Sequence, residues 1–317
     1  MRAYIIRRLL LIIPTLFIVS LIIFTSIRLI PGSVVDYIVS SYEFQTKADL
    51  QTVRHELGLD KPMLEQYGIW MGQIIVHGNL GKSMIDQTPV VEDLKARWPV
   101  TVELGILALI FAQLISIPIG IYSAIRQDSI GDFFARSFAI LAISIPPFFL
   151  ATLVIVFPSI WWHYMPSIKL IEFTKDPLGN LKMFIIPAIV LGISMAGLTM
   201  RMTRTMMLEV LRQDYVRTAW AKGLTERVVV LRHALKNALL PIITIIGSQI
   251  PLLVGGSVII ENIFQLPGMG QLFINVIAKR DYTVVSSVVL LYAVAIVFIN
   301  LLTDLTYGML DPRVHYN

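Results

Sequence analysis

Long runs of apolar residues dominate this sequence and recur along its length. A helix that crosses the hydrocarbon core of a bilayer needs about 20 such residues, because each residue adds about 1.5 Å to a helix and the core is about 30 Å thick. Six stretches meet this requirement: Leu9–Ile30, Leu104–Ile125, Phe133–Phe157, Phe184–Met200, Leu239–Ile260 and Val284–Thr303. The pattern predicts an all-α integral membrane protein with six transmembrane helices.

The polar segments between these runs differ in their content of Lys and Arg. Basic residues gather at the N-terminus (Arg2, Arg7, Arg8), at Arg126, and between Arg201 and Asn237. Short segments rich in Lys and Arg stay on the cytoplasmic side of a membrane, so we predict a cytoplasmic N-terminus. An even number of spans then places the C-terminus in the cytoplasm as well.

The segment from Pro31 to Pro99 is predicted to lie outside. Apolar residues follow a helical spacing at Leu50, Val53 and Leu57, and again at Met63, Leu64 and Tyr67. We therefore predict three parts: an N-terminal transmembrane helix at 1–30, an external and mostly helical subdomain at 31–99, and a five-helix core at 100–317 that carries a cytoplasmic loop at 201–238.

Composition supports a membrane protein and excludes several kinds of site. Of the 317 residues, 56% are hydrophobic and 15% are charged, whereas soluble domains carry about 25% charged residues. The net charge of +5 does not indicate nucleic-acid binding, because the basic residues sort by side of the membrane. The chain has no cysteine and its histidines lack metal-ligand spacing, so we expect no catalytic, cofactor or metal site.

One motif resembles a nucleotide-binding loop. The stretch "VHGNLGKSM" ends in Gly81-Lys82-Ser83, as a phosphate-binding loop does, but that loop requires glycine five positions before Gly81, where Val76 stands. The segment is also predicted to lie outside the cell, away from ATP. We interpret it as an external turn.

The predicted spans contain no apparent relay of buried ionisable residues, which a proton-driven carrier usually requires. Glu103 and Asp304 fall at the edges of spans. We therefore expect energy to come from a partner protein. An ion- or proton-coupled carrier acting alone, an intramembrane enzyme and a scaffold without a pathway are the alternatives.

Polar and helix-breaking residues within the spans are candidates for a translocation pathway or gate. Prolines bend spanning helices and small residues allow close helix contact, although both also occur in helices that are merely kinked. The candidate pathway and gate residues are Gln113, Ser144, Pro146, Pro147, Ser248, Gln249, Ser257, Pro267 and Gly268.

A short amphipathic helix is predicted just before the fifth span. Asp214 can cap its N-terminus, and Gly223 can supply the left-handed residue that ends it. One face is apolar and consists of Tyr215, Val216, Ala219 and Trp220. Such a helix suits either anionic lipid or a groove on a soluble partner.

This segment resembles the cytoplasmic signature of ABC-importer permeases, in which Glu-Ala-Ala is followed, four residues after its last alanine, by glycine. Arg217-Thr218-Ala219 and Gly223 occupy these positions. The first two positions depart from the signature in the manner of the subgroup that imports peptides and, in some members, nickel. Further stretches resemble that subgroup, namely "RLIPGS", "LGLDKPMLEQY", "GNLGKS", "LRHALKNALLP", "ENIFQLPGMGQL" and "KRDY".

The resemblance, to the B-type dipeptide/oligopeptide permease subunits, implies a type I ABC-importer permease fold in a bacterial or archaeal inner membrane. It implies a pathway built with a second homologous permease subunit, two cytoplasmic ATP-binding subunits that hold ATP and Mg²⁺, and an external substrate-binding protein. The cargo would be peptides, with nickel or another small solute as the alternative. The ATPase coupling helix would comprise Asp214, Tyr215, Arg217, Thr218, Ala219, Trp220, Lys222 and Gly223.

Overall fold

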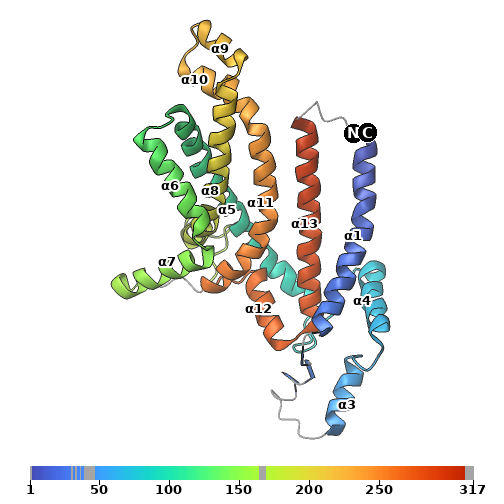
Figure 1. Ribbon diagram of the computed structural model, residues 1–317. Coiled ribbons are helices and arrows are strands. Elements are labelled where there is room, and N and C mark those ends of the chain that lie inside the picture. Colours follow the sequence, from blue (N-terminus) through green and yellow to red (C-terminus); the bar gives the residue numbers. More distant parts are fainter. Residues whose placement is uncertain are drawn as a thin grey trace. The chain divides into compact units, whose positions relative to one another are not determined.

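The computed structural model describes residues 2–29, 31–32, 34–35, 37–38, 47–163 and 169–310 (Figure 1). Within these ranges the chain is helical, and the only β pairing is an isolated bridge between Lys82 and Pro89. The helices are α1 (Arg2–Leu29), α3 (Lys47–Glu56), α4 (Met63–His77), α5 (Val90–Ile125), α6 (Ile130–Ser144), α7 (Pro147–Trp162), α8 (Pro177–Leu211), α9 (Asp214–Ala221), α10 (Glu226–Val228), the π-helix η1 (Val229–Ala234), α11 (Leu235–Ile263), α12 (Met269–Lys279) and α13 (Tyr282–Leu310). The predicted all-α class is confirmed.

Five of the helices are long and apolar enough to cross a membrane: Ile6–Leu29, Val90–Ile125, Pro177–Leu211, Glu226–Ile263 and Tyr282–Thr303. They contain the predicted first, second, fourth, fifth and sixth spans, except that Ile30 lies outside the described residues. The fourth helix extends well beyond the predicted Phe184–Met200, because its ends are amphipathic and do not register as apolar runs.

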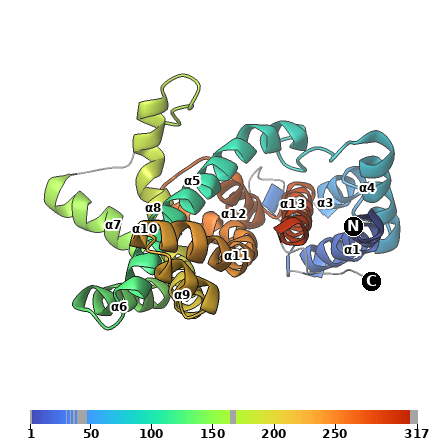
Figure 2. The ribbon, with the colours of Figure 1, turned by 90° about the horizontal axis from the view of Figure 1, so that it is seen from above.

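The predicted third span, Phe133–Phe157, corresponds to two helices, α6 and α7, which together are long and apolar enough to form one broken span. The chain bends by 96° between α6 and α7 (Figures 1 and 2). Ile145, which precedes a proline, takes an extended conformation (φ −85°, ψ 119°), and Pro147 then starts a new helix. Proline disfavours the helical conformation in the residue before it and suits the first turn of the helix after it, which explains the bend.

The contacts divide the chain into two compact units. Unit 1 consists of Val102–Leu266 and the part of α13 from Phe298, and unit 2 consists of Arg2–Thr101 and Pro267–Val297. The predicted external subdomain at 31–99 therefore folds with α1, α12 and the start of α13. The three-part division of the chain stays a prediction.

In unit 1, α8 lies against α5 and α6 at very short range. A Cβ atom on Gly192 would stand 2.6 Å from the Ala108 carbonyl oxygen of α5, and one on Gly197 would stand 2.7 Å from the Ala139 carbonyl oxygen of α6. Small residues let helix backbones approach in this way inside membranes, where close packing drives association. The packing holds α8 at the centre of the unit.

In unit 2, an aromatic cluster joins α1 to α4. Tyr67 is buried against Phe24, with ring centroids 5.3 Å apart, and its hydroxyl hydrogen-bonds to Ser20 at 2.9 Å. Met63 and Leu64, predicted on the same apolar face, are exposed. The aromatic residue, with its large area and polar tip, makes the contact instead.

Candidate functional site

The segment after α8 forms the short helix α9, which has a defined start and end. Gln213, in an extended conformation (φ −72°, ψ 149°), is the N-cap. The prediction that Asp214 caps the helix is wrong, because its carboxylate lies in the first turn and accepts a hydrogen bond from the Arg217 guanidinium at 3.1 Å. Lys222 ends the helix, and Gly223 follows at φ 75°, a conformation that favours glycine. The predicted reversal at Gly223 is confirmed.

The predicted apolar face of α9 is divided between two roles. Val216 and Ala219 are buried in a cluster with Val229 of η1, and this cluster fixes α9 against the end of α8. Tyr215 and Trp220 are 42% and 45% exposed. Half of the face therefore seats the helix on its own chain, and the other half remains available to a partner.

The polar residues of α9 all lie at the surface. Asp214, Arg217, Thr218 and Lys222 are exposed, as is Gly223. The Tyr215 hydroxyl accepts a hydrogen bond of 2.7 Å from the Asn237 side chain at the start of α11. Figure 1 shows α9 and α10 projecting together from the end of α8 where α11 begins.

The connection from α9 to α11 contains an element that sequence reasoning missed. A short turn of α-helix, α10, passes into the six-residue π-helix η1, which continues into α11 without a break. Val230 and Ala234 of η1 are buried with Met207 of α8 and Ala238 of α11. π-helices often occur at functional sites, but no residue pattern here separates one from an α-helix.

A second missed feature is a buried ion pair beside this projection. Asp132 of α6 is fully buried, and Arg204 of α8 donates to its two carboxylate oxygens at 2.8 Å and 2.9 Å. Asp132 lies just before the predicted third span, and Arg204 lies beyond the predicted end of the fourth. Because both residues lie outside the predicted spans, the apolar pattern gives no reason to expect them to be buried. The pattern Ser129-x-x-Asp132, typical of a helix start, was the available signal.

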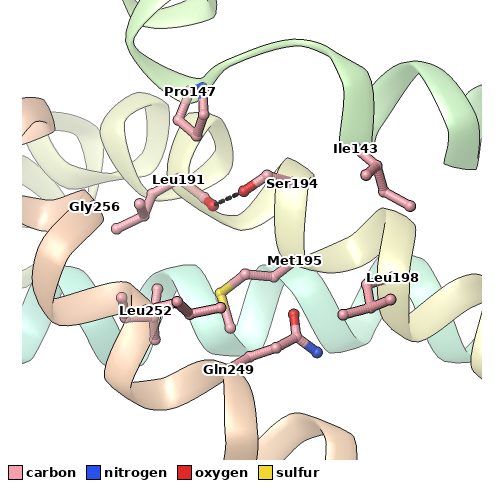
Figure 3. Close-up of a pocket in the computed structure, with 10 residues that line it drawn as sticks. Ile143, Pro147, Leu191, Ser194, Met195, Leu198, Gln249, Leu252 and Gly256 are labelled. Atoms are coloured by element: carbon pink, nitrogen blue, oxygen red, sulfur yellow. Dashed lines mark hydrogen bonds between the residues drawn. The ribbon is translucent and has the colours of Figure 1, made fainter.

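A cavity of about 300 Å³ lies deeper in unit 1, where the ends of α6 and α7 meet α8 and α11 (Figure 3). Two polar residues line it among apolar ones: Ser194, whose hydroxyl donates to the Leu191 carbonyl at 3.2 Å, and Gln249. The Gln249 amide also donates to the Thr199 hydroxyl at 2.9 Å. The remaining lining residues are Ile143, Pro147, Leu191, Met195, Leu198, Leu252, Leu253 and Gly256.

Of the predicted pathway residues, the structure brings Pro147 and Gln249 together at this cavity. Ser144, Pro146 and Ser248 are exposed and do not line it. The remaining candidates lie elsewhere: Gln113 accepts from the Ser116 hydroxyl at 3.4 Å, the Ser257 hydroxyl donates to the Val254 carbonyl at 3.0 Å, and Pro267 and Gly268 begin the second segment of unit 2. Their pathway roles stay predictions.

The described residues contain no group of three or more His, Cys, Asp or Glu side chains that could hold a metal ion. The cavity presents an amide and a hydroxyl, both already hydrogen-bonded within the chain. This arrangement suits passage or loose accommodation of a solute better than covalent chemistry, which requires a positioned nucleophile or acid–base group.

The family profile "Binding-protein-dependent transport system inner membrane component" matches residues 116–316, and its N-terminal counterpart matches residues 1–105. The dipeptide transport system permease protein DppB of Escherichia coli K12 is 39% identical over 100% of this chain and 99% of its own length. A putative peptide transport system permease protein of Brucella suis is 38% identical over the full length of both chains.

A solved structure supports the fold. A chain of the MetNI methionine ABC transporter, in an inward-facing conformation, superposes with a TM-score of 0.54 and 19% identity, covering 69% of this chain and 96% of that chain. At this identity the likeness concerns the fold alone.

Proposed function

The chain belongs to the family of binding-protein-dependent transport system inner-membrane components, and from this premise we propose that it is a pathway-forming permease subunit of an ATP-driven peptide importer. It has the type I ABC-importer permease fold. The proposal of a peptide cargo rests on the match, at 38–39% identity and full length, to permeases named for dipeptide or peptide transport. Nickel or another small solute is the alternative cargo.

In this proposal α9 is the coupling helix, and residues 214–234 (α9, α10 and η1) form the coupling segment. The exposed Tyr215 and Trp220, with Arg217 and Lys222 beside them, offer a mixed apolar and basic surface to a cytoplasmic ATPase. Two such ATPases bind ATP and Mg²⁺, a second homologous permease completes the pathway, and an external substrate-binding protein delivers the peptide.

Movement of the ATPases reaches the membrane through the coupling segment. Val216 and Ala219 attach α9 to η1, and η1 is continuous with α11, which carries Gln249 and other lining residues of the cavity. A displacement of α9 therefore moves one wall of the cavity. The cavity is the proposed part of the pathway within this chain, with Pro147 and Gln249 on its walls.

Reconstitution of the complete complex tests this function. The chain is purified from its native membrane with the proteins that hold it and placed in liposomes. Labelled dipeptides, oligopeptides or nickel are then supplied, each with and without ATP. We expect peptide uptake that requires ATP and an external binding protein. Uptake of nickel alone would assign the alternative cargo, and uptake by the single chain without ATP would contradict the importer.

Gly223 provides a sharper test of the coupling segment. Proline cannot adopt the positive φ of 75°, so Gly223→Pro should abolish the stimulation of ATP hydrolysis by peptide while the chain still inserts into the membrane. Asparagine tolerates the left-handed conformation, so Gly223→Asn is the matched control and should keep most of the stimulation. Normal stimulation in the proline variant would contradict the proposed role of the coupling segment.

A further inference from the structure

The turn between α5 and α6 (residues 126–129, the α5–α6 turn) is held by a fully buried carboxylate. Asp132 accepts two hydrogen bonds from Arg204, one from the Ser123 hydroxyl of α5, and one of 3.0 Å from the Asp128 backbone amide. The Arg136 guanidinium lies 3.5 Å away on the exposed side. The carboxylate thereby connects α5, the turn, α6 and α8 at one point.

A second ion pair connects the same turn to the coupling segment. The Arg126 guanidinium lies 3.6 Å from the Glu226 carboxylate, at the first residue of α10. An apolar cluster supports this contact, because Ala124 at the end of α5 is buried with Met207 of α8 and with Val230 and Ala234 of η1. The turn is therefore attached to the chain both before α9, through Arg204, and after α9, through Glu226.

The turn is also the start of a helix that reaches the cavity. α6 begins at Ile130 and spans 15 residues, about 22 Å of helix, to the level of Ile143. Ile143 lines the cavity at the end of α6, and Pro147 lines it at the start of α7. A shift of the α5–α6 turn would thus be transmitted along a packed helix to a wall of the cavity that α11 does not form.

We propose that the α5–α6 turn moves as one body with the coupling segment, and that Asp132 and Arg204 are positioning residues that pass this movement through α6 to the cavity. The inference rests on the proposed importer function and adds a second route to the one through α11. The geometry favours a positioning role because a two-oxygen Arg–carboxylate fork fixes the direction between two helices. A buried ion pair is a weak means of stabilisation compared with apolar packing, so stability alone is a poor explanation for it.

The first experiment loosens the fork in the reconstituted complex. Arg204→Lys keeps the charge but loses the two-oxygen fork, and it should lower the peptide transported per ATP hydrolysed by about fivefold, within the range for changes along a coupling route. Arg201→Lys, the same change on an exposed arginine of α8, is the matched control and should leave this ratio unchanged. A normal ratio in Arg204→Lys would overturn the inference.

A second variant guards against misfolding. If Arg204→Lys does not assemble, the pair Asp132→Leu with Arg204→Met removes both charges, an exchange that proteins often tolerate without loss of stability. This variant should assemble yet show the same low ratio of transport to ATP hydrolysis. If the ion pair had only a structural role, this double variant would show a normal ratio of transport to ATP hydrolysis, and that result would overturn the inference.

The second experiment locks the two parts together. The chain has no cysteine, so Arg126→Cys with Glu226→Cys introduces a unique pair that a short bifunctional thiol reagent can bridge. Parts that move as one body tolerate the bridge, so ATP-driven uptake should continue after bridging. Loss of uptake on bridging would overturn the inference, whereas absence of ATP-driven uptake in the unmodified complex would refute the importer function itself.

Discussion

The buried carboxylates Asp132 of unit 1 and Asp281 of unit 2 are held by different kinds of partner. Asp132 in unit 1 faces the guanidinium of Arg204, a formal positive charge on another helix. Asp281 in unit 2 accepts hydrogen bonds from the Ser83 hydroxyl at 2.6 Å and from the Met84 and Val284 amides at 3.3 Å and 3.2 Å. The charge of Asp132 is balanced by a cationic side chain, whereas Asp281 is held by the dipoles of a hydroxyl and two backbone amides.

The difference follows from what each carboxylate joins. Asp281 precedes α13 and caps it through the Val284 amide, while Ser83 and Met84 belong to a turn almost 200 residues earlier in the chain. This bond fixes a loop on a helix end, where the partial positive charge of the helix suffices. Asp132 also lies in the first turn of a helix, α6, and accepts from the Asp128 backbone amide, but in addition it reaches the flank of α8, where Arg204 supplies a full charge.

The largest expected loss of stability comes from removing the negative charge of Asp132. Asp132→Asn removes the anion and leaves Arg204 largely buried without its counterion, which should lower the free energy of unfolding by about 3–5 kcal/mol. Denaturant titration of the purified complex in mixed micelles measures this loss. Recovery of most of the stability in the double variant Asp132→Leu with Arg204→Met would confirm that the stranded charge, and not lost packing, is the cause.

The same substitution in unit 2 should have a smaller effect. Asp281→Asn keeps the Oδ1 acceptor for the Val284 and Met84 amides but turns an NH₂ group toward the donor Ser83, at a cost of about 2–3 kcal/mol. The titration used for Asp132→Asn gives the comparison directly. Equal losses for the two asparagine variants would show that the cation does not distinguish the sites.

A pair of serine variants sharpens the comparison further. The Ser83 hydroxyl donates to Asp281 and also accepts from the Ile85 and Asp86 amides, so Ser83→Ala should cost about 1.5–2 kcal/mol. Ser123→Ala removes one donor from Asp132, whose two bonds to Arg204 remain, and should cost less than about 1.5 kcal/mol. A larger loss for Ser123→Ala would mean that the hydroxyl, and not Arg204, is the main partner of Asp132.

The sequence predicted those parts of the fold that depend on length and periodicity. Apolar runs of about 20 residues located the long helices, and Gly223 marked the end of α9 because few other residues accept its backbone conformation. Pro146 and Pro147 indicated a bend in the third span, but not one of 96°. The bend angle depends on how α7 packs against α8 and α11, which periodicity does not contain.

The contacts of Asp132 and Asp281 could not be predicted from residue patterns, for different reasons. Asp132 stands at the edge of an apolar run, where a carboxylate is ordinarily solvated, and its burial depends on Arg204 approaching from α8. Ser83 and Asp281 lie in "GNLGKS" and "KRDY", two stretches that carry the family resemblance, but nothing in either indicates that they meet. The π-helix η1 was missed because its hydrogen-bond register leaves no mark on residue type.

The smallest expected effect concerns the exposed ion pair that ties the α5–α6 turn to α10. The side chains of Arg126 and Glu226 are 58% and 47% exposed, so water and salt screen their attraction. Arg126→Ala should lower the free energy of unfolding by at most about 1 kcal/mol, and this loss should vanish at about 1 M salt, where the screening length is about 3 Å. The loss in Asp132→Asn should persist at that salt concentration, because its carboxylate is out of contact with solvent. A salt-sensitive loss at Asp132, or a salt-resistant loss at Arg126, would contradict the difference in burial between the two ion pairs.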